Sequence, residues 1–287
     1  MVVVHAHRLV VTMALVVVAG NGCGGADAEA LRVDSYVAMG DSFTSAPGVP
    51  VTDMTTGCQR SDHNYPALLA DSLDARFVDV SCGGAATTAI GGPQQTTAGL
   101  KPPQIEAVQG ETDLVTIGIG INDFGLYGSL VFECTLLAAS DPTGSPCRDA
   151  MATSDGDRLE QTIDEIGFQV QIVVSSIRER APEARVVVVG YPQFVPPSGT
   201  CAELPLASGD YPYVRGLIER LGRTLEAAAA AESTDYVDLA AASRGHDICA
   251  GAEAWVNGSQ DSPGRAIVYH PFPEEQDAVA KLIRDLL

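Results

Sequence analysis

The tetrapeptide Gly40–Phe43 (Gly-Asp-Ser-Phe) places a serine where a nucleophile could be built. It directly follows the short apolar run Ser35–Met39. A serine at the end of a buried strand is held out of the sheet on a tight turn, and the small Gly40 lets the backbone make that turn. Gly-Asp-Ser alone is weak evidence, because about one chain in ten of this size contains it by chance. The value of Ser42 therefore depends on a base and an oxyanion hole elsewhere in the chain.

Histidine is the side chain best suited to take a proton from serine near neutral pH. After residue 30 the chain has three histidines: His63, His246 and His270. His270 stands in Tyr-His-Pro just before the last helical pattern, so a loop after the final strand can present it to the serine. We therefore expect His270 to be the base, and we expect surface or capping roles for the other two.

Two more polar motifs follow strand-like runs in the same way as Ser42. They read Ser-Cys-Gly-Gly-Ala at 81–85 and Gly-Ile-Asn-Asp at 120–123. In open α/β sheets, ligands bind outside the carboxyl ends of the strands. The three motifs should therefore converge on one crevice.

An acyl-transfer enzyme must also stabilise a developing oxyanion. The backbone N–H groups of Ser42 and Gly84 and the carboxamide of Asn122 could do this, each donor being worth roughly 3–4 kcal/mol of barrier. Taken singly, Gly84 could mark a plain turn and Asn122 a helix cap. Their joint placement after consecutive strands favours the oxyanion hole. Asp41 and Asp123 are expected to brace their turns.

Strand-like and helical patterns alternate along the chain. The strand runs are mostly continuous and β-branched, as in strands covered on both faces: Ser35–Met39, Phe77–Val80, Leu114–Ile119, Arg185–Val189 and Tyr236–Leu239. The helical patterns are Pro66–Asp74, Asp157–Arg180, Tyr211–Ala231 and Glu274–Leu287. This order predicts one doubly wound, three-layer α/β/α domain over 31–287 with a mostly parallel five-stranded sheet. The stretch 125–154 is interpreted as a disulfide-braced excursion within that domain.

Composition narrows the function classes. The 287 residues are 46% hydrophobic and 19% charged, which is typical of a globular protein with an ample core. The net charge of -20 leaves no basic stripe for nucleic acid. The chain has no phosphate-binding loop, dinucleotide fingerprint, C-x-x-C pair or cysteine–histidine cluster of zinc-ligand spacing. We expect no metal and no organic cofactor, and we expect a monomer.

The N-terminus predicts export. A basic start precedes the apolar run Leu9–Ala19, which has the length of a signal-peptide core, so we assign 1–30 to a signal peptide. Two exits are open. Ala-Glu-Ala at 28–30 fits ordinary cleavage and secretion, the alternative that we favour. Gly-Asn-Gly-Cys at 20–23 is an imperfect lipobox, in which Cys23 would be lipidated and anchor the protein at the outer face of the membrane.

The cysteine count agrees with export. Removing or lipidating Cys23 leaves six of the seven cysteines, and an even set in an exported chain indicates three disulfides. Six cysteines allow fifteen pairings. The sequential pairing closes loops of modest length, and each bridge would add roughly 2–4 kcal/mol. That pairing is Cys58–Cys82, Cys134–Cys147 and Cys201–Cys249.

From about Tyr36 to the C-terminus the chain resembles the SGNH hydrolase superfamily of GDSL lipases and esterases, whose fold is flavodoxin-like. The resemblance is to its exported actinobacterial branch with three disulfides. Gly40–Phe43 is similar to the block that carries the nucleophile, which implies Ser42. Cys82–Ala85 resembles the block whose oxyanion donor is Gly84. Pro102–Ile105, leading to 120–123, resembles the block that places the other donor at Asn122.

Further segments extend the resemblance. Residues 58–61 followed by Tyr-Pro at 65–66 look like the branch's segment before its first helix. Residues 245–249 and Trp255 resemble its third-disulfide region, which implies a structural role for His246. His-Pro at 270–271 resembles the last block. The ordered set is far more specific than any single block.

Two positions depart from the family pattern. Ile121 replaces the second glycine of Gly-Gly-Asn-Asp, which would tighten or reshape the acyl pocket. Ile267 stands where an aspartate often precedes the histidine by three residues, and its side chain cannot orient an imidazole. Related proteins use a backbone carbonyl there, so the resemblance implies that the Ile267 carbonyl orients His270, with Asp261 as the second candidate. The prediction is a Ser–His dyad.

Together these observations predict a secreted or lipid-anchored serine carboxylic-ester hydrolase, a lipase or esterase. Its substrates would be short- to medium-chain acyl esters or lipids, with phospholipids and acetylated glycans as alternatives. A different class stays open, namely a non-catalytic surface lipoprotein or binding module on the same scaffold. The missing aspartate at Ile267 and the cysteine of the lipobox favour that class, and the intact serine, histidine and oxyanion donors oppose it.

Overall fold

The computed structural model describes residues 1–3 and 32–287. Apart from residues 1–3, the predicted signal peptide lies outside the described residues, together with its cleavage motif at 28–30 and Cys23. Residues Arg32–Leu287 form one compact unit. In the described part of the chain, no helix has the length and apolarity needed to cross a bilayer.

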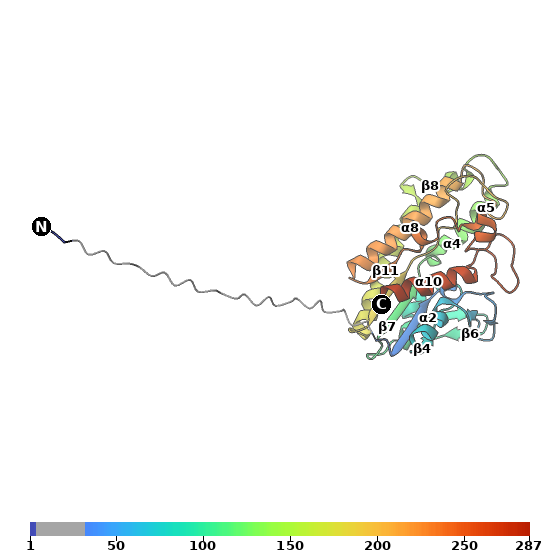
Figure 1. Ribbon diagram of the computed structural model, residues 1–287. Coiled ribbons are helices and arrows are strands. Elements are labelled where there is room, and N and C mark those ends of the chain that lie inside the picture. The colour runs from blue at the N-terminus through green and yellow to red at the C-terminus, as the bar shows by residue number, and fades with distance from the viewer. Residues whose placement is uncertain (4–31) are drawn as a thin grey trace. The chain divides into compact units, whose positions relative to one another are not determined.

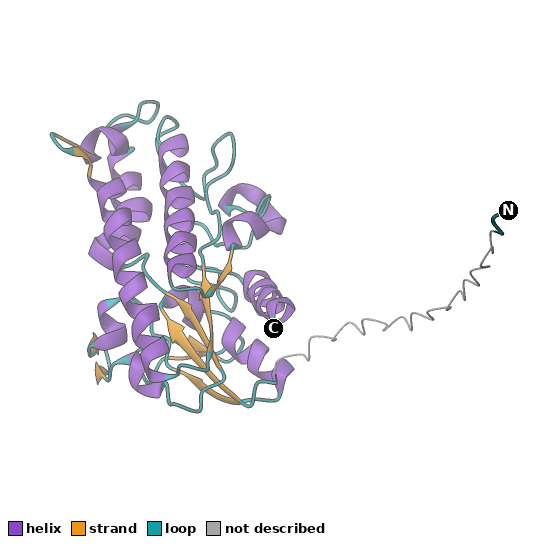
Figure 2. Ribbon diagram, turned by 90° about the vertical axis from the view of Figure 1, so that its left-hand side faces the viewer, coloured by secondary structure: helices purple, strands orange, loops and turns teal. Residues whose placement is uncertain are grey.

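A five-stranded sheet forms the centre of Arg32–Leu287, as predicted (Figures 1 and 2). The spatial order is β11-β10-β7-β1-β4, and every neighbouring pair is parallel. The strands are β1 (Ser35–Gly40), β4 (Arg76–Asp79), β7 (Leu114–Gly118), β10 (Arg185–Val189) and β11 (Asp235–Val237). Gly40 of β1 pairs with Gly118 of β7 at the carboxyl edge of the sheet. The predicted doubly wound α/β fold is confirmed.

Helices cover both faces of this sheet, as Figure 2 shows. One face packs against α7 (Arg158–Arg180) and α8 (Tyr211–Ala231), and the other packs against α2 (Tyr65–Leu73) and α10 (Pro273–Leu286). Alternate residues of each strand enter the two cores, as the period of two requires. In β1, for example, Val37 and Met39 join the first core, while Tyr36 and Ala38 join the second.

Short elements form the rest of this unit. The helices are α1 (Ser42–Ser45), α3 (Thr88–Gly91), α4 (Leu126–Gly128), α5 (Cys134–Leu137), α6 (Pro146–Met151) and α9 (Leu239–Ala242). The 3₁₀ helices are Gln104–Ala107, Asp123–Gly125 and Ile248–Glu253, and Ser129–Glu133 is a π-helical turn. The hairpins are β2 (Thr52–Asp53) with β3 (Arg60–Ser61), β5 (Gln94–Thr96) with β6 (Gly99–Lys101), and β8 (Ala152–Thr153) with β9 (Gly156–Asp157).

Two local predictions can be compared with these elements. The strand predicted over Tyr236–Leu239 ends earlier, at Val237, because the Asp238 side chain accepts a hydrogen bond from the N–H of Ala241 and caps α9. The six cysteines are joined in the sequential pairing, Cys58–Cys82, Cys134–Cys147 and Cys201–Cys249. The second of these bridges lies within 125–154 and connects α5 to α6.

Candidate active site

Ser42 is the first residue of α1, two residues after the end of β1. Asp41 caps this short helix, and its Oδ1 accepts a hydrogen bond of 2.8 Å from the N–H of Phe43. Gly40 has a φ of +150°, and a Cβ atom there would lie 2.3 Å from Thr44 Oγ1 and 2.5 Å from the Gly118 carbonyl oxygen. The turn that presents Ser42 therefore requires glycine at position 40.

Two buried glutamines fasten this turn from distant parts of the chain. Gln104 pairs with both backbone groups of Gly40: its Oε1 accepts from the Gly40 N–H at 2.8 Å, and its Nε2 donates to the Gly40 carbonyl at 3.0 Å. Gln276 of α10 donates from Nε2 to the Phe43 carbonyl at 3.0 Å. Reasoning from the sequence missed both roles, because nothing local to either glutamine indicates its partner.

His270 lies beside the serine turn. Its ring stacks on Phe43, the residue after Ser42, with ring centroids 5.7 Å apart and planes 29° from parallel. Its Nδ1 is 2.7 Å from the Val268 carbonyl oxygen. Because a carbonyl can only accept, Nδ1 must carry the proton, which leaves Nε2 as the acceptor.

Burial favours the neutral form of His270. It lowers the pKa of the imidazole to about 4, although the hydrogen bond to the Val268 carbonyl opposes this shift. An imidazole with this pKa is unprotonated at pH 7 and can accept the proton of a serine hydroxyl.

The carbonyl that bonds Nδ1 belongs to Val268, so the prediction of Ile267 is wrong. The Ile267 carbonyl instead accepts from the backbone N–H of His270 at 3.3 Å and from Asn257 Nδ2 at 3.0 Å. Tyr269 has a φ of +57°, which turns the chain between Val268 and His270. This turn brings the carbonyl two residues before the histidine, and not the one three residues before it, to the ring.

Asp261, the second candidate for orienting His270, bonds a backbone group close to the histidine. Its Oδ1 accepts a hydrogen bond of 3.1 Å from the backbone N–H of Val268. The carboxylate thus supports the residue whose carbonyl bonds the histidine. No hydrogen bond or ion pair between Asp261 and the imidazole occurs in the described part of the chain.

Hydrogen bonds connect the motif of Gly84 to the serine turn and the motif of Asn122 to that of Gly84. The N–H of Cys82 donates to the Gly40 carbonyl at 3.0 Å, and Asn122 Nδ2 donates to the Ala85 carbonyl at 3.0 Å. The carboxamide of Asn122 keeps a second N–H for a ligand. Gly84 has a φ of +73°, and no atom lies within 4 Å of the place where its Cβ would be. This backbone is therefore open to a substrate.

The aspartates of these motifs brace the turns, as expected. Asp123 accepts from the N–H of Thr87 at 3.0 Å and from its hydroxyl, which joins the third motif to the residues that follow the second. Ile121 is fully buried in the first core, and its N–H donates to the Tyr191 hydroxyl at 3.1 Å. The Ile121 side chain thus fills the interior and does not line an open pocket.

The other two histidines lie apart from this group. His63 is on the surface, with its Nδ1 2.6 Å from Asp62 Oδ1. His246 stacks on Trp255, with ring centroids 4.3 Å apart and planes 9° from parallel, and its Nδ1 is 2.6 Å from the Glu253 carbonyl oxygen. Within residues 1–3 and 32–287, no group of three or more histidine, cysteine, aspartate or glutamate side chains could hold a metal ion.

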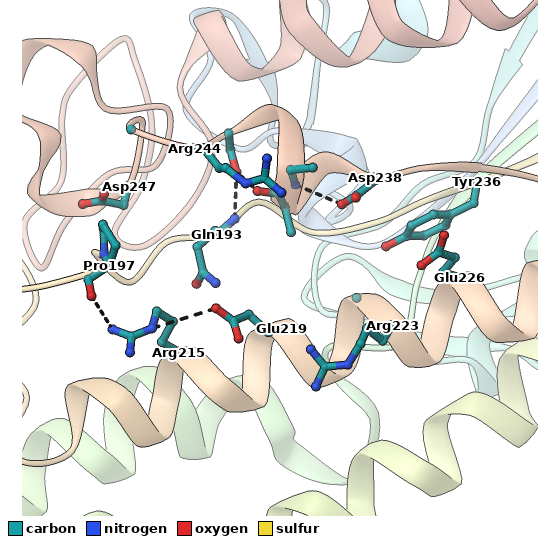
Figure 3. A pocket seen from close by; sticks show the side chains of 15 residues that line it. Gln193, Pro197, Arg215, Glu219, Arg223, Glu226, Tyr236, Asp238, Arg244 and Asp247 are labelled. Atoms are coloured by element: carbon teal, nitrogen blue, oxygen red, sulfur yellow. Dashed lines mark hydrogen bonds and ion pairs between the residues drawn. The ribbon is translucent and has the colours of Figure 1, made fainter.

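A separate cavity opens beyond the ends of β10 and β11 (Figure 3). Its volume is about 420 Å³, and charged side chains of α8 and of residues 238–247 line it, among them Arg215, Arg223 and Arg244. Ser42, Gly84, Asn122 and His270 are not part of its lining. The candidate active site and this cavity are therefore different places on the same edge of the sheet.

The chain is similar to known lipases and acylhydrolases in sequence and in structure. The model of the GDSL-like lipase/acylhydrolase family matches residues 38–276. "Lipase 2" of Streptomyces coelicolor is 38% identical over 229 residues, which are 78% of this chain and 76% of that protein. The crystal structure of the extracellular lipase of Streptomyces rimosus covers 88% of this chain and 100% of its own, with 28% identity and a TM-score of 0.73. That of phospholipase A1 from Streptomyces albidoflavus covers 88% and 99%, with 29% identity and a TM-score of 0.71.

Proposed function

Because the chain belongs to the GDSL-like lipase/acylhydrolase family and is a carboxylic-ester hydrolase, we propose that Ser42 is its nucleophile and His270 its base. The observation that carries this proposal is the neutral imidazole stacked on the residue next to Ser42, with Nδ1 bonded to a backbone carbonyl. This arrangement is a Ser–His dyad, in which a peptide group takes the place of the third side chain of a triad.

In the proposed reaction, Ser42 Oγ forms a bond to the ester carbonyl carbon while its proton moves to His270 Nε2. The tetrahedral intermediate then breaks the bond to the alkoxy group, which leaves as the alcohol after taking the proton from Nε2. Water attacks the acyl-serine in the same way: it gives one proton to Nε2, the acid is released, and Ser42 regains its proton. The step needs no other reactant.

The N–H groups of Ser42 and Gly84 and the Asn122 carboxamide are the proposed oxyanion donors. Such donors contribute because they are already oriented when charge develops on the carbonyl oxygen. The bonds of Asn122 to Ala85 and of Cys82 to Gly40 support this role by fixing the donor-bearing loops to each other and to β1. Removal of one donor typically lowers kcat by about 10²–10³-fold.

We propose acyl esters and lipids as the substrate class. Three large apolar side chains are exposed just after Asn122: Phe124 at 60%, Phe132 at 47% and Leu136 at 77%. Phe132 also contacts Tyr269, the neighbour of His270, with ring centroids 5.9 Å apart. From 126 to 140 the sequence has one charged residue, Glu133, in a chain of net charge -20. An acyl chain could lie on this apolar surface next to the dyad.

Phospholipid hydrolysis is the first specific alternative within this class. The solved structure of phospholipase A1 from Streptomyces albidoflavus, which has a TM-score of 0.71 to this chain, supports it.

Export is supported by the three disulfides and by the extracellular lipase of Streptomyces rimosus. A lipid anchor at Cys23 is the alternative to free secretion.

The test is hydrolysis of p-nitrophenyl acetate and butyrate by the wild type, Ser42→Ala and His270→Ala. We expect each substitution to lower kcat by about 10³-fold or more, because nucleophile and base act as one unit. His63→Ala is the matched control, since this histidine is on the surface and should leave activity unchanged. Full turnover by folded Ser42→Ala would contradict the proposal, and absence of Ser42-dependent turnover on any ester would favour a binding module.

A chain-length series tests the substrate class. With p-nitrophenyl esters from acetate to decanoate, Leu136→Ser should lower kcat/KM for long chains about 2–10-fold, because it removes exposed apolar area that a long chain would cover. Phe168→Ser, on the outer face of α7 and 62% exposed, is the matched control and should have no effect. An equal loss in both variants would argue against the surface around 124–136.

A further inference from the structure

Tyr191 lies between the two halves of the proposed site. It comes two residues after the end of β10, and its side chain is buried. Its hydroxyl donates to Asp41 Oδ2 at 2.6 Å and accepts from the N–H of Ile121 at 3.1 Å. Asp41 directly precedes Ser42, and Ile121 directly precedes Asn122. One phenol oxygen therefore connects the turn of the nucleophile to the loop of an oxyanion donor.

We propose that Tyr191 is a positioning residue that fixes Ser42 and Asn122 relative to each other. This inference rests on the proposed function of these two residues. It assigns to Tyr191 a role in the transition state rather than in substrate binding, because nucleophile and oxyanion donor act together only when the tetrahedral intermediate forms.

The pattern of hydrogen bonds shows why the hydroxyl matters here. The two strands that lead to these loops pair up to Gly40 and Gly118, and the N–H of Asp41 still donates to the Gly118 carbonyl. Beyond this point, no hydrogen bond in the described part of the chain joins Asp41–Ser45 directly to residues 119–123. The Tyr191 hydroxyl bridges the two segments through a single atom, whereas the other route passes through residues 82–85.

The ring of Tyr191 adds a second route of support. Phe43 packs edge-on against it, with ring centroids 5.2 Å apart and planes at 90°. The same Phe43 stacks on His270. Tyr191 therefore contacts both the residue before Ser42 and the residue after it, and the latter supports the base. A shift of about 1 Å in such a group can cost about 10²-fold in rate.

Every hydrogen bond around the Tyr191 hydroxyl and the Asp41 carboxylate has a donor and an acceptor only when Asp41 is ionised. The carboxylate then accepts from Phe43 and from Tyr191, and the phenol oxygen accepts from Ile121. A protonated Asp41 would donate to Tyr191 and leave the phenol proton without an acceptor. Desolvation raises the pKa of Asp41 to about 7, the Tyr191 and Phe43 bonds oppose this, and the nearby Asp123 carboxylate raises it further. The other titratable groups that face it are Tyr65 and Tyr127.

The experiment compares Tyr191→Phe with Tyr36→Phe. Each variant loses one buried phenol hydroxyl. That of Tyr36, in β1, is 2.7 Å from Thr116 Oγ1, and this residue has no role in the proposed site. With p-nitrophenyl butyrate, Tyr191→Phe should lower kcat about 10–100-fold with KM within twofold. Tyr36→Phe should lose comparable thermal stability but keep kcat within twofold.

The pH profile separates positioning from general destabilisation. We expect kcat/KM of the wild type to fall as the pH drops through about 7, where Asp41 takes up a proton, and we expect this step to move to higher pH in Tyr191→Phe, because the lost hydrogen bond lowers the pKa of Asp41. Asp41→Asn is the second variant, for use if Tyr191→Phe does not fold. Its amide has one oxygen in place of the two that accept from Phe43 and Tyr191, so it should show the same loss of kcat and no step near pH 7.

Two results would overturn the inference. One is a kcat for Tyr191→Phe within twofold of the wild type, and the other is an equal loss in Tyr191→Phe and Tyr36→Phe. Ser42→Ala, measured on the same ester, keeps this separate from the proposed function. If turnover depends on Ser42 but not on Tyr191, only the inference fails. If turnover does not depend on Ser42, the proposed function fails first.

Discussion

The turn that carries Ser42 and the loop that carries His270 differ in what holds their backbones. The serine turn, residues 40–43, is bonded by side chains from far along the chain. Gln104 reaches Gly40 over a separation of 64 residues, and Gln276 reaches Phe43 over 233. The histidine loop, residues 257–270, is shaped largely by bonds within itself, and longer bonds add to them, among them those from the Tyr127 hydroxyl to the Tyr269 carbonyl and from the Ile267 N–H to the Pro47 carbonyl. Asn257 bonds the carbonyls of Gln260, Ala266 and Ile267, at separations of 3, 9 and 10 residues.

Substitutions in the two regions should therefore affect different properties of the protein, namely stability and activity. The partners of the serine turn are buried glutamines whose loss leaves backbone groups of the core unpaired, so such changes should lower the stability of the whole unit. The partners of Asn257 in the histidine loop are local. Changes there should move the imidazole, and thus lower activity, while most of the fold stays intact.

Gln104→Leu should have the largest effect on the stability of the serine turn. It leaves the N–H of Gly40 buried without a partner, while the Gly40 carbonyl keeps the hydrogen bond from the Cys82 N–H. An unpaired buried group costs about 1–3 kcal/mol, so the free energy of unfolding should fall by about this amount in urea titrations. Gln109→Leu is the control, because the Gln109 side chain bonds the Glu106 carbonyl on the surface. Equal stability of both variants would contradict the dependence of the serine turn on Gln104.

Asn257→Ala, in the histidine loop, should lower activity strongly and stability only slightly. It removes the five hydrogen bonds of the Asn257 side chain, which include the bond to the Ile267 carbonyl. We expect kcat on p-nitrophenyl butyrate to fall about 10–100-fold, because the base is displaced. The midpoint of thermal unfolding should fall by only a few degrees, about the effect of 1 kcal/mol. A large loss of stability with unchanged kcat per folded molecule would show that the loop is not a local unit.

The two regions should also titrate separately. Asp41 of the serine turn has a raised pKa of about 7, and His270 has a lowered pKa of about 4. As the pH falls, kcat/KM should therefore drop partially near 7, when Asp41 is protonated, and completely near 4, when the imidazole is protonated and can no longer act as base. The measurement is kcat/KM from pH 3.5 to 9. A single step near pH 6.5 would contradict the burial of His270.

The sequence predicted the parallel five-stranded sheet because continuous β-branched runs and alternating helices leave few other arrangements. It also predicted that the motifs of Ser42, Gly84 and Asn122 lie after neighbouring strands. It could not assign the carbonyl that bonds His270, since this depends on the positive φ of Tyr269. Nor could it assign Tyr191, whose partners lie 150 and 70 residues away and become neighbours only when the sheet forms.

We propose that a backbone carbonyl, and not a side-chain carboxylate, orients His270. Asp261→Ala tests it most directly, because Asp261 is the second candidate for orienting His270 and its carboxylate bonds the N–H of Val268. Removal of the carboxylate of a true triad costs about 10⁴-fold in kcat. We predict that folded Asp261→Ala keeps kcat on p-nitrophenyl butyrate within about tenfold of the wild type, while His270→Ala loses about 10³-fold or more. A loss of about 10³-fold or more in Asp261→Ala would contradict the Ser–His dyad.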